Sequence, residues 1–331
     1  MSQYQLSDFD YHLPESLIAQ QPAQSRDSAR LLVYDRASGS ITDDYFYNIQ
    51  QYLPDQTTLV LNNSKVEKCR LLFGNKEVFI LDRHDPQTVS AMVRPGKKFK
   101  KGRTVTLSDS ISAEVLAIED DGIRRLRLNR DLDESIIDQH RYTPFPPYIE
   151  QNESLSEEYQ TVFADPTGSK AAPTAGLHFT KNLLSEIKKN HPVVEITLHV
   201  GLGTFAPVKT ENIEEHNMHS EWFELTETAA SELSEARHIT AVGTTSVRVL
   251  ESAANAQRNF SPERDDTEIF IMPGYQFKAV DALITNFHLP KSTLLMLVAA
   301  FIGFDEMKRI YRHAIDKEYR FYSFGDAMLL L

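Results

Sequence analysis

The chain has 331 residues, of which 41% are hydrophobic and 25% charged, and its formal net charge is −12. The longest apolar run, residues 293–304, is too short to span a bilayer, and the polar N-terminus has no signal-peptide pattern, so we expect no membrane partner. The single cysteine, Cys69, excludes an internal disulfide and a cysteine-based zinc site, and it indicates a reducing, cytoplasmic location. This length favours two domains.

The first part of the chain contains a short apolar run, Leu59–Leu61, that predicts a buried strand. From residue 66 to residue 130 the pattern changes to short alternating runs separated by Gly, Asp, Asn and Pro. The six strands predicted there are 66–73, 77–81, 89–93, 104–107, 111–118 and 123–128. Six strands at this regular spacing predict a small antiparallel β-barrel, which ends at the proline-rich stretch 144–147.

After residue 159, helical patterns alternate with β-rich runs, which is typical of an α/β layer. The helices are predicted at 182–189, 227–238, 247–256 and 293–318, and the strands at 193–200, 239–242, 268–271 and 282–285. We therefore expect an α/β main domain made of residues 1–63 and 150–331. Residues 64–149 are expected to form an inserted six-stranded antiparallel β-barrel.

Four segments rich in Gly, Thr, Ser and His stand where β-rich runs end or helical patterns begin: 171–180, 198–205, 241–248 and 285–293. In open α/β sheets, ligands bind at the carboxyl ends of the strands, so the four segments predict one shared pocket. The residues predicted to bind a ligand there are Thr174, Gly176, Phe179, Gly201, Gly203, Thr204, Thr244, Thr245, Ser246, Arg248, Asn286, Phe287 and His288.

The charge is unevenly distributed. Residues 64–149 hold 16 Lys and Arg against 13 Asp and Glu, a net charge of +3, whereas the rest of the chain holds 19 against 34, a net charge of −15. One cluster has six cations and no acid: Arg94, Lys97, Lys98, Lys100, Lys101 and Arg103. Such a cluster predicts binding to a polyanion such as RNA, although lysines can also protect a sheet edge from aggregation.

Residues 319–326 alternate aromatic and charged side chains, which is typical of contacts to single-stranded RNA. We assign Arg320 and Tyr322 to such contacts or to the lining of the pocket. The alternative is a last strand packed into the core.

Several motifs carry a resemblance to a known family. Besides the four segments above they are SDFDYHLPESLIAQQP at 7–22, LVLNNSKV at 59–66, PFPPYI at 144–149, HNMHSEW at 216–222, IFIMPGYQF at 269–277 and YRFYSFGDAML at 319–329. In this order and spacing, the chain resembles the S-adenosylmethionine:tRNA ribosyltransferase-isomerases of queuosine biosynthesis over most of its length.

The resemblance implies the same two-domain plan and a reaction that consumes S-adenosylmethionine as a co-substrate. Its ribosyl part would be transferred and isomerised onto 7-aminomethyl-7-deazaguanine in the wobble position of tRNA. The products would be epoxyqueuosine-tRNA, adenine and methionine.

Such a reaction needs a base to remove a proton next to the sulfonium. His178 is our first candidate and His199 the second. His288 is a further candidate, because an unperturbed imidazole gains and loses its proton near neutral pH. Glu251 is a candidate hydrogen-bond acceptor for the ribose or the amine. Aromatic side chains such as Phe179 and Phe287 would suit the sulfonium.

The turn 243–246 opens a helix whose free N–H groups would bind an anion, either the methionine carboxylate or a tRNA phosphate. Arg248 lies one turn in and could add a contact. We expect no metal, because the His216 and His219 pair lacks further ligands.

Two other function classes remain open: an S-adenosylmethionine-dependent RNA methyltransferase and a non-catalytic RNA-binding protein. The first normally has a Gly-x-Gly-x-x-Gly turn, and the third glycine is missing here, at Ala206. We expect a monomer or a weak homodimer.

Overall fold

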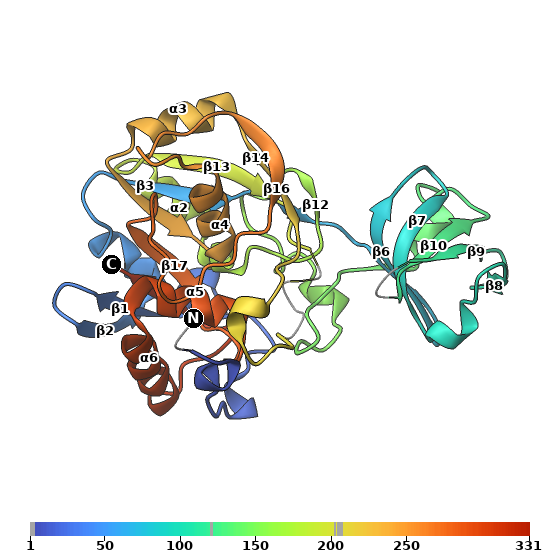
Figure 1. Cartoon of the computed structure of the whole chain (residues 1–331), viewed down its shortest axis with the longest axis horizontal. Coiled ribbons are helices and arrows are strands. Elements are labelled where there is room, and N and C mark those ends of the chain that lie inside the picture. The colour runs from blue at the N-terminus through green and yellow to red at the C-terminus, as the bar shows by residue number, and fades with distance from the viewer. Residues whose placement is uncertain (1–3, 120–121, 202, 204–207) are drawn as a thin grey trace. The chain divides into compact units, whose positions relative to one another are not determined.

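The computed structural model describes residues 4–119, 122–201, 203 and 208–331. The chain divides into two compact units: Met1–Lys65 together with Pro146–Leu331, and the insert Val66–Phe145. The first unit is a mixed α/β structure with a large sheet, and the insert is a separate antiparallel sheet (Figure 1). Within the described residues, no helix is both long and apolar enough to cross a membrane.

The large sheet has nine strands in the order β16-β14-β13-β3-β15-β17-β18-β1-β2. Their bounds are β1 Arg30–Asp35, β2 Ser40–Tyr45, β3 Thr57–Asn62, β13 Val193–Leu198, β14 Glu221–Leu225, β15 His238–Val242, β16 Glu263–Thr267, β17 Ala282–Asn286 and β18 Ala327–Leu330. The central strands β13, β3, β15 and β17 are parallel to one another. Their carboxyl ends therefore meet at one edge of the sheet.

The prediction of a strand at 268–271 was wrong, because β16 ends at Thr267. The Thr267 hydroxyl accepts a hydrogen bond from the Ile269 N–H at 3.2 Å and turns the chain at this point. Strands β1, β2, β14 and β18 were not predicted.

Alternation along the strands gives the sheet two apolar faces. Leu32 of β1 and Val60 of β3 face one core, and their neighbours Leu31 and Leu59 face the other. The helices of this unit are α2 (Lys181–Ile187), α3 (Glu227–Glu235), α4 (Thr244–Ala253), α5 (Thr293–Ile302) and α6 (Phe304–Asp316). Helices α3 to α6 pack into the first core and α2 into the second, so the sheet lies between two layers (Figure 1).

The predicted helix 293–318 is two helices. The break is at Gly303, whose φ of +94° is costly for any residue with a Cβ. Helix α5 is apolar and buried, whereas α6 buries only one face. The glycine thus ends the core helix and starts a surface helix.

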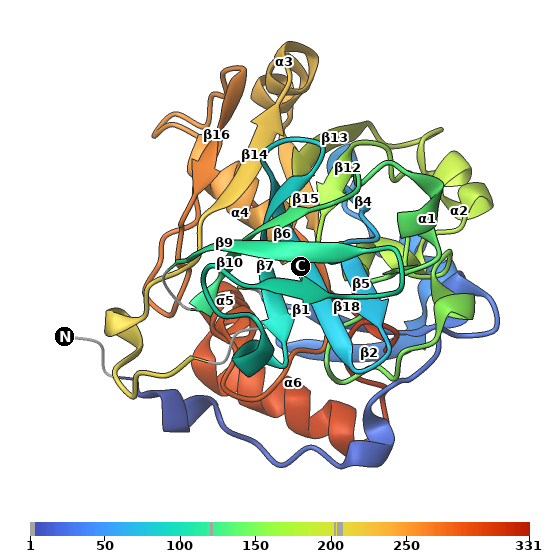
Figure 2. The same ribbon diagram turned by 90° about the vertical axis from the view of Figure 1, so that its right-hand side faces the viewer.

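The insert is a seven-stranded antiparallel sheet in the order β11-β5-β6-β7-β10-β9-β8 (Figure 2). Its strands are β5 Arg70–Phe73, β6 Lys76–Arg83, β7 Thr88–Arg94, β8 Thr104–Thr106, β9 Ser112–Ile118, β10 Arg124–Leu128 and β11 Arg141–Tyr142. The six predicted strands are present, the first of them shorter than expected, and β11 is additional. No ladder joins the end strands β11 and β8 among the described residues, so the hydrogen bonding does not close the sheet into a barrel.

The insert has its own core on one face of this sheet, built from residues such as Leu71, Val78, Val115 and Leu126. Other short elements are α1 (Ser135–Asp138) in the insert, the strands β4 (Lys65–Val66) and β12 (Thr167–Ser169), and several 3-10 helices.

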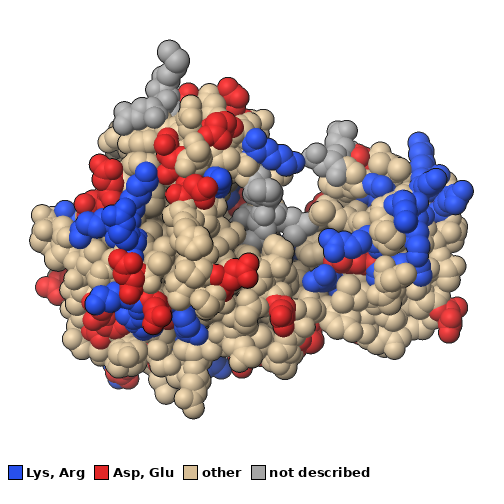
Figure 3. Space-filling view, turned by 90° about the horizontal axis from the view of Figure 1, so that it is seen from below, with Lys and Arg blue, Asp and Glu red and all other residues tan. Residues whose placement is uncertain are grey.

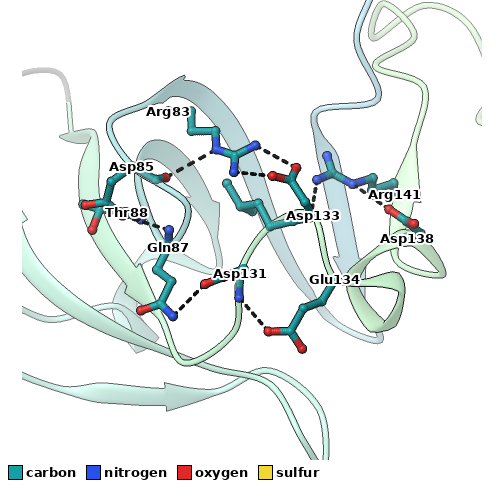
Figure 4. A network of polar contacts seen from close by, with 10 residues as sticks. Arg83, Asp85, Gln87, Thr88, Asp131, Asp133, Glu134, Asp138 and Arg141 are labelled. Carbon is teal, nitrogen blue, oxygen red and sulfur yellow. Dashed lines mark hydrogen bonds and ion pairs between the residues drawn. The ribbon is translucent and has the colours of Figure 1, made fainter.

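A polar network holds the segment that carries α1 to strands β6 and β7 (Figure 4). Arg83 makes a bidentate contact with Asp133, at 2.8 and 2.6 Å, and the Gln87 amide donates to Asp131 at 2.7 Å. Arg141 donates to the Leu132 carbonyl at 2.7 Å. The network lies at the surface of the insert, where such pairs stabilise only modestly.

Candidate active site

A cavity opens at the carboxyl edge of the large sheet, within the α/β unit. Its open space is about 720 Å³, a volume that includes solvent at its mouth. All four predicted segments contribute to its wall, the segment 198–205 through Val200, and the loops around residues 148 and 322 complete it. The lining residues include Tyr148, Ala172, Pro173, Thr174, Val200, Gly243, Thr244, Thr245, Thr285, Asn286, Phe287, His288, Ser292, Tyr322 and Ser323.

The wall of this cavity is uncharged. None of the described lining residues is an Asp, Glu, Lys or Arg. Burial lowers the pKa of His288 to about 3, so this imidazole is neutral at pH 7. Its Nε2 lies 2.9 Å from the Thr285 hydroxyl, and its backbone N–H donates to the Tyr311 hydroxyl.

Helix α4 begins at the cavity. Its N-cap is Gly243, whose φ is +89°, and Thr244 and Thr245 of the first turn line the wall. The first N–H groups of a helix have no partner within it, so they can receive an anion. Ser246 does not line the cavity, and its hydroxyl donates back to the Val242 carbonyl at 2.8 Å.

His178 is separated from the cavity by Asn286. The Thr174 hydroxyl donates to Asn286 Oδ1 at 2.9 Å, and Asn286 Nδ2 lies 3.0 Å from His178 Nε2. Burial, with Arg320 and Arg26 adding to it, lowers the pKa of His178 to about 3. His178 does line a second, smaller cavity on its other side, together with Arg26 and Glu158.

His199 also lies away from the cavity wall. Its ring stacks on Trp222, with centroids 5.0 Å apart and planes at 21°. The other side of the ring meets the backbone of Gly168, where an added Cβ would lie 2.7 Å from Nε2. Packing fixes this imidazole between two neighbours.

Glu251 and Arg248 are buried side chains of α4 that do not reach the cavity. Glu251 accepts hydrogen bonds from the Tyr275 hydroxyl and from the backbone N–H groups of residues 278–280, at 2.8 to 3.1 Å. Arg248 forms an ion pair with Glu221 and donates to the Thr267 carbonyl at 3.0 Å. Both side chains therefore tie segments of the fold together.

The other predicted ligand residues have packing roles. An added Cβ at Gly176 would meet Phe163 at 2.7 Å, and Phe179 is fully buried against Phe46. The Gly201 N–H donates to Glu221 at 2.8 Å, and Gly203 lies against the His219 ring. Thr204 lies outside the described residues.

Two tyrosines line the cavity, one of which was missed from the sequence. Tyr322 was predicted, whereas Tyr148 was not, although it stands in the quoted motif PFPPYI. The neighbouring Arg320 faces elsewhere, because it contacts Asp326 and the Gln21 carbonyl.

The six cations of the first basic cluster lie in the insert, on β7 and the segment that leads to β8. All six are exposed, and no Asp or Glu among the described residues pairs with any of them. Lys and Arg gather on the face of the insert shown at the right of Figure 3. The insert also has a second basic cluster, made of Arg124, Arg125, Arg127 and Arg130, in which Arg125 and Arg130 pair with Glu119 and Glu134.

No group of three or more His, Cys, Asp or Glu residues in the described ranges is arranged to hold a metal ion.

Comparisons with known proteins agree with one another. The family model described as "Queuosine biosynthesis protein" matches residues 6–330. The chain is 46% identical to the S-adenosylmethionine:tRNA ribosyltransferase-isomerases of Desulfitobacterium hafniense and Caldanaerobacter subterraneus, covering 98% of this chain and 99% of each relative.

A solved structure is also similar. It is the crystal structure of the S-adenosylmethionine tRNA ribosyltransferase of Thermotoga maritima, with a TM-score of 0.56 and 37% identity over 98% of this chain and 100% of that one. The chain therefore belongs to the queuosine biosynthesis family, among the S-adenosylmethionine:tRNA ribosyltransferase-isomerases.

Proposed function

We propose that this enzyme transfers the ribosyl part of S-adenosylmethionine to 7-aminomethyl-7-deazaguanine in the wobble position of tRNA and isomerises it. The products are epoxyqueuosine-tRNA, adenine and methionine. The observation that carries the proposal is the near end-to-end match to enzymes with this name, together with a cavity at the sheet edge where the matching motifs meet. An RNA methyltransferase and a non-catalytic RNA-binding protein are the alternatives that the assay below separates.

S-adenosylmethionine is proposed to occupy the uncharged cavity as a consumed co-substrate, with no metal. Its methionine carboxylate lies at the N-terminus of α4, beside Thr244 and Thr245, where unsatisfied N–H groups favour an anion. Of the two anions considered from the sequence, the carboxylate is favoured, because these residues share their cavity with the rest of the proposed S-adenosylmethionine site.

His288 is the proposed proton acceptor, in place of His178 or His199. It is the candidate histidine on the cavity wall, whereas His178 lies behind Asn286 and His199 lies between Trp222 and Gly168. When the carbon next to the sulfonium loses its proton to His288, the positive charge moves from the ligand to the imidazole. The total charge of the cavity is then unchanged, which keeps the step accessible to a base of low pKa.

The insert is proposed to act as a barrel-like domain that contacts tRNA through its first basic cluster. Exposed cations without acidic partners are available to phosphates, and they release counterions when they bind. Because tRNA is the proposed second substrate, we place the reaction in the cytoplasm, catalysed by a monomer or weak homodimer.

A product assay tests the proposal. The protein is incubated with S-adenosylmethionine and tRNA that bears 7-aminomethyl-7-deazaguanine, and the small molecules are identified by mass spectrometry. Adenine and methionine are expected together with a matching mass gain on the tRNA. S-adenosylhomocysteine would indicate a methyltransferase, and tRNA binding without turnover would indicate a binding protein.

The same assay tests the proton acceptor. We expect His288→Gln to lower kcat by about 10²- to 10⁴-fold with little change in the KM for S-adenosylmethionine. His178→Gln is the matched control, because its amide can still bond to Asn286, and it should lower kcat much less. A larger loss of kcat in the control than in His288→Gln would identify His178 as the proton acceptor instead.

A further inference from the structure

We infer that Tyr148 and Tyr322 form an aromatic wall that receives the sulfonium of S-adenosylmethionine and sets the preference of the cavity for the charged ligand. This inference deepens the proposed function and rests on it. It gives the contact with the sulfonium to two side chains that come from separate sequence motifs and meet only in the structure.

The two rings form a pair on one side of the cavity. Their centroids are 4.7 Å apart, and their planes make an angle of 49°, so the pair is tilted rather than stacked. The Tyr148 hydroxyl lies 2.9 Å from the hydroxyl of Ser323, another lining residue. This hydrogen bond fixes the Tyr148 ring beside its neighbour.

The backbone of Tyr322 is held in an unfavourable conformation. Its φ is +72°, in the left-handed region that bulky side chains avoid. A residue persists in such a conformation only where the surrounding structure enforces it, and such residues concentrate at functional sites.

Hydrogen bonds on both sides of Tyr322 hold its backbone in this conformation. The Tyr322 N–H donates to the Phe287 carbonyl at 3.1 Å, and the Gly325 N–H donates to the Tyr322 carbonyl at 3.0 Å. The buried carboxylate of Asp326 accepts from the backbone N–H groups of Arg30 and Arg320, at 2.9 and 2.8 Å. The loop is therefore locked, and the ring is kept on the cavity wall at the expense of the backbone.

The chemistry of the ligand explains why rings, rather than a carboxylate, suit this position. A sulfonium is permanently positive, and its removal from water is costly without a partner. Aromatic faces attract a cation within about 6 Å of the ring centroid, and the described lining residues include no carboxylate.

A carboxylate would bind the cation more strongly, but it would also oppose the reaction. When the C–H bond next to sulfur breaks, the electron pair stays on carbon and the proton moves to the base, which leaves a neutral ylide. A carboxylate would lose its attraction at this step, whereas the weaker attraction of two rings is a smaller loss.

The test compares two ligands that differ in charge. The dissociation constants of S-adenosylmethionine and S-adenosylhomocysteine are measured by calorimetry for the wild-type protein, Tyr148→Leu and Tyr322→Leu, with Tyr148→Phe and Tyr322→Phe as ring-preserving controls. In each Leu variant, we expect the preference for the sulfonium over the neutral thioether to fall by about 2- to 30-fold. The Phe variants should keep the preference.

Equal losses of affinity for both ligands would show that the rings stack on the adenine instead, and an unchanged preference would show that they do not face the sulfonium. Either result overturns the inference. The product assay on wild-type protein is run alongside, because failure to release adenine and methionine there would refute the proposed function instead.

Should the Leu variants fail to fold, a second series keeps the test decisive. Tyr148 is replaced by phenylalanines of increasing fluorination, which weakens the negative face of the ring with little change in size. Affinity for S-adenosylmethionine should fall stepwise while that for S-adenosylhomocysteine stays constant. Parallel trends for the two ligands would contradict the inference.

Discussion

The two units of this protein treat charge in opposite ways. Around the cavity of the α/β unit, the described lining is neutral, and Arg248 and Glu221 of the same unit form a buried ion pair. On the insert, the six cations of the first basic cluster are exposed and have no acidic partner among the described residues. We therefore expect the cavity to recognise a small ligand by shape and by hydrogen-bond dipoles, and the insert to recognise a polyanion by its exposed positive charge.

The largest expected effect follows from breaking the buried ion pair. In Arg248→Met, the buried Glu221 carboxylate loses its contact with the Arg248 guanidinium, and we expect a loss of about 3–5 kcal/mol in the free energy of unfolding, measured in urea. The control is Arg264→Met, because Arg264 pairs with Glu224 at 2.6 Å but its side chain is 73% exposed. It should lose no more than about 1 kcal/mol. Similar losses in both variants would contradict the distinction between buried and exposed charge.

A second effect is the dependence of stability on pH. The pKa of His178 is about 3 in the folded protein and near 6.5 when unfolded, so the unfolded state binds more protons between these values. Stability is thus complete above pH 6.5 and falls as the pH drops toward 3, by about 2 kcal/mol at pH 5 from this group. The curve of unfolding free energy against pH should be flatter in His178→Gln, and a curve parallel to wild type would disprove the shift.

The third effect concerns tRNA binding by the first basic cluster of the insert. Replacing Lys97, Lys98, Lys100 and Lys101 by Gln should weaken tRNA binding about tenfold or more at 0.1 M salt. The slope of log K against log salt should become shallower by about 0.7–0.9 for each phosphate that the variant no longer neutralises. Affinity for S-adenosylmethionine should not change.

The matched control for this variant neutralises four exposed lysines of the α/β unit: Lys181, Lys188, Lys189 and Lys317. If it weakens tRNA binding as much as the insert variant does, the effect comes from total charge, and the local role of the insert is refuted.

The smallest effect is expected in the polar network of the insert. Arg83→Gln removes a bidentate pair whose side chains are 40% and 72% exposed, so stability should change by no more than about 1 kcal/mol in thermal or urea unfolding. A loss above about 2 kcal/mol in the free energy of unfolding would contradict this and would mean that the network is essential to the stability of the insert.

Much of the fold could be predicted where the local pattern is strong. The insert strands alternate regularly between turn residues, and β13, β15 and β17 are short runs rich in apolar and β-branched residues. The missed strand β2 is largely exposed, so its sequence SITDDY carries no apolar alternation. The break at Gly303 was missed because the helical pattern continues on both sides of it.

The site was harder to predict, because side-chain direction depends on local geometry. Thr174 and His178 are four residues apart, which would place them on one face of an α-helix. The structure has a 3-10 helix there, with three residues per turn, so the two side chains point roughly 120° apart. Thr174 consequently reaches the cavity, and His178 lies behind Asn286.

The position of β18 has a consequence for the order in which the protein can fold during synthesis. This strand lies between β17 and β1, and it pairs Leu31 of β1 with Ala327 near the other end of the chain. The hairpin of β1 and β2 is translated long before β18, yet among the described strands it is β18 that joins it to the rest of the large sheet. Until β18 is made, the nascent chain exposes the edges of β1 and β17 that this strand later pairs, so the large sheet becomes continuous only when β18 is added.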